Sequence, residues 1–159
     1  MKKISKFVTD LGAAAYLMMH KYKVISKKGK SIYFEMIDRE EQDFDRLTMD
    51  YLSSDFHKFD SCLMSLKKTS DYLPVKVNRF VTDLGVAAYL MMHEYKVIGK
   101  KSKSIYFEKI EKKDYFENAE KINKEFHQLI MDYLCSEFHR FDSCLMALKK
   151  ISEYIDVHE

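Results

Sequence analysis

One short motif occurs twice in the chain and contains side chains that could support nucleophilic or metal chemistry. It reads Phe-His-[Lys/Arg]-Phe-Asp-Ser-Cys, and its reactive residues are His57, Asp60 and Cys62 in one copy and His139, Asp142 and Cys144 in the other. A histidine near a cysteine can activate the thiol as a nucleophile, with an aspartate to orient the imidazole. Two histidines and two cysteines can also complete a tetrahedral zinc site.

Neither chemistry has the spacing that usually accompanies it. Zinc sites generally contain a close ligand pair such as Cys-x2-Cys, which this chain lacks. An aspartate ahead of an apolar stripe is typical of a helix N-cap, and the stripe expected here is Cys62, Leu66, Thr69 and Leu73. We therefore expect a break at residues 56–59, a helix capped by Asp60, and buried structural cysteines. No enzymatic activity, no metal and no cofactor are predicted.

The motif is duplicated because nearly the whole chain is a tandem repeat. Residues 6–37 align with residues 79–110 at an offset of 73, and 26 of these 32 positions are identical. Residues 48–72 align with residues 130–154 at an offset of 82, with 18 of 25 identical. The second copy therefore contains nine extra residues, which lie within 111–126. Insertions generally settle in loops or at exposed helix ends, so the copies should differ there.

Each copy predicts the same elements. A short strand at Phe7-Val8 precedes a helix that Thr9-Asp10 can cap, and its nearly uniform apolarity predicts burial. Residues 23–37 form a hairpin pattern around a glycine turn, and in the second copy the glycine is displaced to Gly99. A second helix has the stripe Phe44, Leu47, Thr48, Tyr51 and Leu52, with acidic residues at its start.

These patterns predict an α+β fold made of two β-α-β-β-α-α repeats. The first repeat spans residues 1–73, a linker with the only proline spans 74–78, and the second repeat spans 79–159. A repeat of this length buries little apolar surface by itself. We therefore expect the repeats to pack on each other as an intramolecular pseudo-twofold dimer.

The pattern Phe-Val-Thr-Asp-Leu-x-x-Ala-Ala-Tyr-Leu, then Ile-Tyr-Phe-Glu, then Leu-Met-x-Leu-Lys-Lys, resembles a small domain family of bacteriophages, prophages and other mobile elements. The matching residues are 7–17, 32–35 and 63–68, and again 80–90, 105–108 and 145–150. Members of that family often carry glycine where the first helix turns into the hairpin, and this chain has Lys21 and Glu94 there. The family has no assigned activity, so the resemblance implies a phage-like origin and action inside a bacterial cell.

Composition favours a protein partner. The net charge is only +2, which does not by itself indicate nucleic acid or an anionic membrane. The longest apolar run, Ala13 to Met19, is too short to span a bilayer, so the predicted location is the host cytoplasm. Ten methionines and twenty-two Phe and Tyr residues exceed what a small core needs, and five methionines could face outward, namely Met36, Met49, Met64, Met131 and Met146. The leading hypothesis is a non-enzymatic phage-type inhibitor or regulator that docks on a host protein complex, for example an anti-CRISPR protein.

The alternative is a regulator that binds DNA or RNA through the two basic hairpins. Lysines at the tips could contact phosphates, and Tyr22, Tyr33, Tyr95 and Tyr106 could stack on bases. Lysines at hairpin tips also commonly protect strand edges from pairing. Candidate binding residues are the hairpin lysines and tyrosines together with basic and aromatic residues of the insertion: Lys23, Lys27, Lys28, Lys30, Tyr33, Lys96, Lys100, Lys101, Lys103, Tyr106, Lys112, Lys113, Tyr115 and Phe116.

Overall fold

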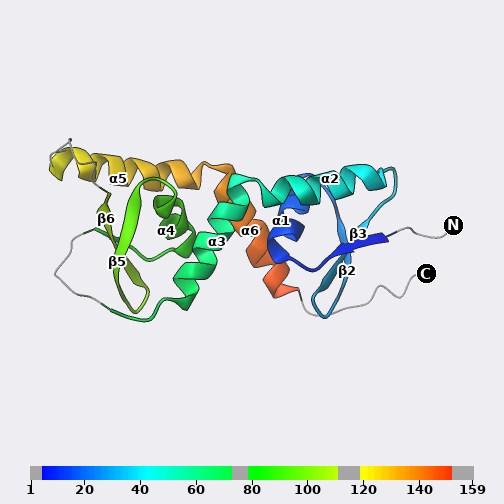
Figure 1. The fold of residues 1–159 in the computed structure, drawn as a ribbon, viewed down its shortest axis with the longest axis horizontal. Coiled ribbons are helices and arrows are strands. Elements are labelled where there is room, and N and C mark those ends of the chain that lie inside the picture. Colours follow the sequence, from blue (N-terminus) through cyan, green and yellow to red (C-terminus); the bar gives the residue numbers. More distant parts are fainter. Residues whose placement is uncertain (1–4, 73–78, 111–118, 152–159) are drawn as a thin grey trace. The chain divides into compact units, whose positions relative to one another are not determined.

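The two copies form the same six elements in the same order. The computed structural model describes residues 5–72, 79–110 and 119–151 (Figure 1). The first copy comprises β1 (Ser5–Val8), α1 (Leu11–Met19), β2 (Val24–Lys28), β3 (Ser31–Glu35), α2 (Glu41–Leu52) and α3 (Asp55–Lys68). The second comprises β4 (Phe80–Val81), α4 (Leu84–Met91), β5 (Tyr95–Lys101), β6 (Ser104–Lys109), α5 (Ala119–Leu134) and α6 (Glu137–Lys150). The predicted α+β class is confirmed.

Each copy contributes one three-stranded antiparallel sheet. The strand orders are β1-β3-β2 and β4-β6-β5, so the second hairpin strand lies in the centre of each sheet. Side chains alternate across a strand, and in β3 the buried positions are Ile32 and Phe34. These two side chains face the helices, and the opposite face of the sheet remains open. As predicted, the apolar helix α1 is buried, and the Asp10 carboxylate caps it by accepting from the amide of Ala13 at 2.9 Å.

The hairpin glycines have different roles in the two copies. In the first copy Gly29 lies in the turn with a φ of 59°, a left-handed conformation that glycine adopts without cost. In the second copy Ser102 occupies that place with a φ of 57°. The prediction that Gly99 replaces the turn glycine is therefore wrong. Gly99 instead lies at a β-bulge in β5, where the register shifts between Val97 and Gly99.

Helix α1 ends in a left-handed residue that is not glycine. The amide of Tyr22 donates to the carbonyl of Leu17 and the amide of Lys21 donates to that of Met18, which is the hydrogen-bond pattern of a Schellman cap. Lys21 therefore takes a φ of 65°, and the equivalent residue Glu94 takes a φ of 67°. The cap typical of glycine forms here with side chains that are strained in it.

The junction between α2 and α3 lies earlier than predicted. Helix α3 begins at Asp55, so residues 56–59 are helical and Asp60 lies inside the helix rather than at its N-cap. The hydroxyl of Ser54 donates to the carbonyl of Tyr51 at 2.6 Å and accepts from the amide of His57 at 3.4 Å. The hydroxyl of Ser54 therefore contacts both the last turn of α2 and the first turn of α3. Ser136 makes the same two contacts between α5 and α6.

The buried stripe of α3 is shifted accordingly. Phe59, Leu63 and Leu66 are buried at helical spacing. Of the predicted stripe, Cys62 and Thr69 are only half-buried, and Leu73 lies outside the described residues. Of the aromatic side chains in the apparent break, Phe59 is therefore a core residue and Phe56 is half-buried, and their spacing of three residues fits a helix face.

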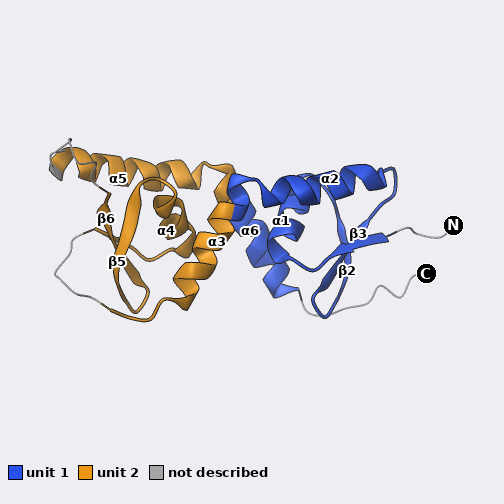
Figure 2. Ribbon diagram, viewed as in Figure 1, with its two compact units in different colours: residues 1–57, 140–159 blue, residues 58–139 orange. Residues whose placement is uncertain are grey.

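The last helices are exchanged between the copies. The chain forms two compact units, unit 1 from residues 1–57 and 140–159 and unit 2 from residues 58–139 (Figure 2). Unit 1 therefore contains β1, β2, β3, α1 and α2 of the first copy with α6 of the second. Unit 2 contains the corresponding elements of the second copy with α3 of the first. The units do not coincide with the sequence repeats 1–73 and 79–159, and the predicted pseudo-twofold packing stays a prediction.

An aromatic cluster holds the exchanged helix in each unit. In unit 1, the ring of Phe141 from α6 lies 6.1 Å from that of Tyr51 and 5.3 Å from that of Phe56. In unit 2, the ring of Phe59 from α3 lies 6.0 Å from that of Tyr133 and 5.5 Å from that of Phe138. Phe59 and Phe141 are both fully buried. Aromatic pairs at these distances add to the stabilisation from burial alone.

The insertion lengthens a helix. Helix α5 has 16 residues and its counterpart α2 has 12, and the difference lies at the N-terminal end of α5. This agrees with the expectation that the copies differ around residues 111–126, of which 111–118 lie outside the described residues. In the described part of the chain, every helix is too short or too polar to cross a bilayer.

Glycine at the left-handed positions should stabilise the protein. Lys21→Gly and Ser102→Gly should each raise the free energy of unfolding by about 1 kcal/mol, because glycine removes the Cβ strain at positive φ. For a chain of this size that corresponds to a rise in Tm of about 2–4 °C. Thermal melts of the single variants would measure it. Lys21→Ala and Ser102→Ala are the controls, because they retain the Cβ, and an equal gain from alanine would contradict the explanation.

Mutations in an exchanged helix should destabilise the unit that receives it. Leu66 in α3 and Leu148 in α6 are equivalent and buried, and truncating either to alanine should cost about 2–5 kcal/mol. Hydrogen exchange should show that Leu66→Ala accelerates exchange in α4 and β6 more than in α1 and β3. Leu148→Ala should do the reverse. If each variant instead affects the sheet of its own repeat, the helices are not exchanged.

Candidate functional site

Two of the predicted binding lysines have structural contacts. The ammonium group of Lys27 donates to the carbonyl of Ile151 at 3.4 Å, just beyond the end of α6. The ammonium group of Lys100, at the equivalent position, donates to the carbonyl of Thr69 at 3.1 Å, just beyond the end of α3. A cation at a helix C-terminus interacts favourably with the helix dipole. These lysines therefore secure the ends of the exchanged helices.

The other hairpin lysines are exposed. They are Lys23, Lys28 and Lys30 in the first hairpin and Lys96, Lys101 and Lys103 in the second. Lys96 lies 3.8 Å from the carboxylate of Glu108 on the neighbouring strand, and both side chains are mostly exposed. Such a surface pair contributes little to stability. The hairpins thus keep most of their predicted positive charge at the surface.

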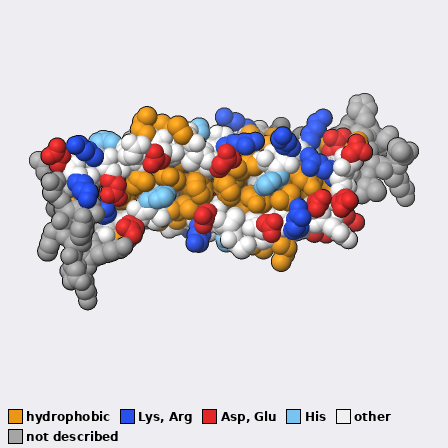
Figure 3. Space-filling view, turned by 90° about the horizontal axis from the view of Figure 1, so that it is seen from above, with side chains coloured by type: hydrophobic (Ala, Val, Ile, Leu, Met, Phe, Trp, Pro, Cys, Tyr) orange, Lys and Arg blue, Asp and Glu red, His pale blue; other side chains and the backbone are white. Residues whose placement is uncertain are grey.

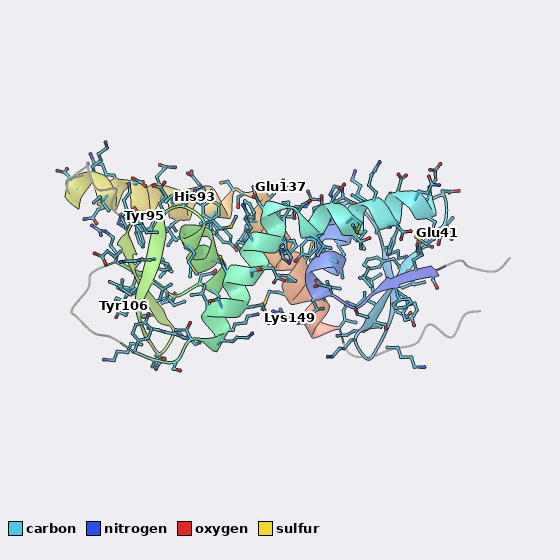
Figure 4. The ribbon with its side chains drawn as sticks, in the orientation of Figure 1. Glu41, His93, Tyr95, Tyr106, Glu137 and Lys149 are labelled. Atoms are coloured by element: carbon cyan, nitrogen blue, oxygen red, sulfur yellow. The ribbon has the colours of Figure 1, made fainter. Side chains whose placement is uncertain are left out.

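The four hairpin tyrosines divide into two classes. Tyr22 and Tyr95 are buried, so neither can stack on a ligand. Tyr33 and Tyr106 are half-buried on the open face of their sheets. In Figure 4, Tyr95 lies directly beneath α5, whereas Tyr106 lies farther from that helix.

Each half-buried tyrosine is paired with a phenylalanine from the first strand of its sheet. The ring of Tyr33 lies 5.3 Å from that of Phe7, and the ring of Tyr106 lies 5.5 Å from that of Phe80. Phe7 is 54% exposed and Phe80 is 49% exposed. The sequence analysis did not single out these phenylalanines. The available signal was the alternation of side chains along residues 5–8, which places Phe7 opposite the buried face.

The remaining predicted binding residues belong to the insertion. Lys112, Lys113, Tyr115 and Phe116 all lie outside the described residues. Their place in a site therefore stays a prediction.

The His–Cys motif does not form a catalytic pair along its helix. His57 and Cys62 lie five residues apart in α3, and at about 100° per residue their side chains point about 140° apart. The imidazole of His57 packs edge-on against Tyr51, with ring centroids 5.4 Å apart, and His139 packs in the same way against Tyr133. Within the residues described, no three His, Cys, Asp or Glu side chains are grouped closely enough to hold a metal ion.

The cysteines of the motif have no activating environment. Burial raises the pKa of the Cys62 thiol, and it also raises the pKa of the Cys144 thiol, where Arg140 has a smaller opposing effect. A raised pKa leaves less thiolate, which is the nucleophilic form, at neutral pH. Cys135 is exposed and has no counterpart in the first copy, where Ser53 stands.

Exposed apolar side chains lie on the outer face of α2 and α5. Met49 is 66% exposed and Leu52 is 55% exposed, and their counterparts Met131 and Leu134 are 59% and 50% exposed. A spacing of three residues places each Met and Leu pair on one helix face. Leu52 belongs to the apolar stripe predicted for its helix, but its side chain is exposed. Figure 3 shows one face of the molecule, on which hydrophobic side chains lie between charged ones.

Two more of the methionines proposed to face outward do so. Met64 on α3 and Met146 on α6 are 46% and 47% exposed, whereas Met36 is buried in unit 1. The exposed methionines therefore occur as equivalent pairs in the two copies, which is the arrangement expected of a repeated surface.

Comparison of the chain with protein-family models, with curated proteins and with solved structures gives no match. The candidate sites are therefore assessed on their geometry alone.

Thiol labelling should distinguish structural from activated cysteines. At pH 8, iodoacetamide should modify Cys135 first, because Cys62 and Cys144 are half-buried and their raised pKa values reduce the thiolate fraction. Peptide mass spectrometry over time gives the three rates, and denatured protein is the control in which they should converge. Faster labelling of Cys62 or Cys144 than of Cys135 would indicate an activated thiol.

Proposed function

We propose that this chain is a non-enzymatic binding protein that docks on a host protein complex through the apolar faces of α2 and α5. The observation that supports it is the exposure of Met49 and Leu52 together with Met131 and Leu134. Methionine suits protein partners because its flexible, polarisable side chain adapts to irregular surfaces. Side chains at i and i+3 on an exposed helix are also the usual anchors for a partner's groove.

The charges around these anchors indicate the partner's chemistry. Helix α2 carries Glu41, Asp43, Asp45 and Asp50 against a single cation, Arg46. Arg46 lies 3.4 Å from Asp43 in an exposed pair. The surface complementary to α2 is therefore an apolar groove bordered by basic side chains. Helix α5 carries Lys121 and Lys124 besides Glu120, Glu125 and Asp132, so its charge is more balanced. The proposed role as an inhibitor or regulator of phage type rests on the sequence resemblance, and it includes action against a defence nuclease.

Affinity purification with matched variants tests this proposal. The tagged protein should recover a host complex from nuclease-treated bacterial lysate, and Met49→Glu with Met131→Glu should abolish recovery. A charge at the centre of an apolar interface costs several kcal/mol when it is desolvated without a partner, which reduces affinity by more than about a hundredfold.

Ser65→Glu with Ala147→Glu is the matched control. These positions are equivalent and exposed on α3 and α6, so the control adds the same charge away from α2 and α5. It should recover the same complex as the wild type. Identical recovery by both double variants would exclude the proposed surface. If the captured complex is a nuclease, the wild-type protein and not the Met49→Glu, Met131→Glu variant should lower its activity.

A further inference from the structure

The open face of each sheet has an aromatic row across its strands. Residues directly opposite in an antiparallel pair point to the same face. In unit 1, Phe7 pairs with Tyr33, and Tyr33 pairs with Ser26 on the third strand. In unit 2, Phe80 pairs with Tyr106 in the same way, and Gly99 takes the place of the serine.

On the third strand, the residue beside each tyrosine is small. The ring of Tyr33 contacts Phe7 on the first strand, but its neighbour on the third strand is a serine. The neighbour of Tyr106 there is a glycine, which has no side chain. The exposed phenylalanine and the half-buried tyrosine thus form an aromatic surface whose two rings are tilted by 39° in unit 1 and by 40° in unit 2. A nucleobase stacks on such a surface whatever its identity, because every base has a π-face.

Cations border the aromatic row. Lys28 pairs with Ser31 in the next row of the same face, and Lys101 pairs with Ser104 in unit 2. Rows on one face are about 7 Å apart along a strand. On the other side of the aromatic row, Lys96 pairs with Glu108.

The balance of charge on each face is positive. In unit 1, Lys23, Lys28 and the turn residue Lys30 stand against Glu35. In unit 2, Lys96, Lys101 and the turn residue Lys103 stand against Glu108 and Asp71, and the Asp71 carboxylate accepts from the amide of Ser102 at 3.1 Å. In contrast to Lys27 and Lys100, Lys28 and Lys101 are exposed beside the aromatic residues. The charge of the face complements a phosphate backbone.

We propose that the open face of each sheet binds single-stranded DNA or RNA, with bases stacked on Phe7–Tyr33 and Phe80–Tyr106 and phosphates near Lys28 and Lys101. This surface is separate from the methionine faces of α2 and α5. It also differs from binding at hairpin tips alone, because the aromatic pair requires unpaired bases. A duplex keeps its bases stacked inside and cannot offer them to the rings.

Fluorescence anisotropy of the full chain with labelled oligothymidylate tests the proposal. Binding should weaken as salt rises, and a duplex of the same length should compete at least about tenfold less well. Phe7→Ala with Phe80→Ala should weaken binding by about tenfold or more, because each lost ring removes a stacked base. Circular dichroism and a thermal melt establish that this variant is folded.

A charge-reversal pair gives a second measurement that does not alter the aromatic row. Lys28→Glu with Lys101→Glu should weaken binding and reduce its salt dependence. Lys68→Glu with Lys150→Glu is the matched control, because these exposed lysines lie at the ends of α3 and α6, and it should bind like the wild type. The proposal would be overturned if duplex competed equally well or if the phenylalanine variant bound like the wild type. It would also be overturned if the lysine control lost as much affinity as the Lys28→Glu, Lys101→Glu variant, or if the wild type did not bind at low salt. If affinity purification recovers no host protein, the protein-docking proposal fails, but the proposal of single-strand binding is unaffected.

Discussion

This architecture depends on one contact in each unit. A phenylalanine from the exchanged helix packs into an aromatic cluster formed by the other copy. Phe141 completes the cluster of Tyr51 and Phe56, and Phe59 completes that of Tyr133 and Phe138. Without its exchanged helix, each unit would lose the phenylalanine ring that packs on Tyr51 and Phe56 or on Tyr133 and Phe138. Burying such a large side chain contributes about 1.5–3 kcal/mol, so neither unit has a complete core from one copy alone.

The sequence predicted the local structure well and the tertiary exchange not at all. Helix α1 and its cap at Asp10 follow from composition and a capping residue, which act over a few neighbouring residues. The exchange could not be read from the sequence, because α3 and α6 are nearly identical and either fits the same receiving surface. A repeated sequence therefore predicts the order of the elements, but it does not indicate which copy supplies the last helix of each unit.

The errors at the candidate site have related physical causes. Asp60 resembles an N-cap by position, but a helix that continues through the motif lets Phe56 pack on Phe141 in unit 1 and Phe59 pack on Phe138 in unit 2. Lys27 and Lys100 resemble their exposed neighbours in sequence, but they pair with the buried Ile32 and Ile105 and contact the exchanged helix ends. The paired exposure of Met49 and Met131 was foreseeable, whereas that of Phe7 and Phe80 required knowledge of which sheet face the helices cover.

The two units differ in the polar contacts that surround their aromatic cores. In unit 1 the Lys6 ammonium lies 2.6 Å from Asp45 and 3.1 Å from Glu41. In unit 2 the guanidinium of Arg79 donates to the amide oxygen of Asn123 at 2.8 Å instead. Lys109, which replaces the buried Met36, lies 2.7 Å from Glu125. Each unit has therefore acquired its own polar contacts around a shared aromatic core.

The exchange of helices also reverses the order in which the two units can be completed during synthesis. Unit 2 is continuous in the chain, from residue 58 to 139, whereas unit 1 lacks α6 until the residues after 139 have been made. At about 5–20 residues per second, the ribosome needs on the order of 4 to 16 seconds to make the intervening segment. Residues 1–57 of the nascent chain thus wait, without the ring of Phe141 on Tyr51 and Phe56, until α6 has been translated.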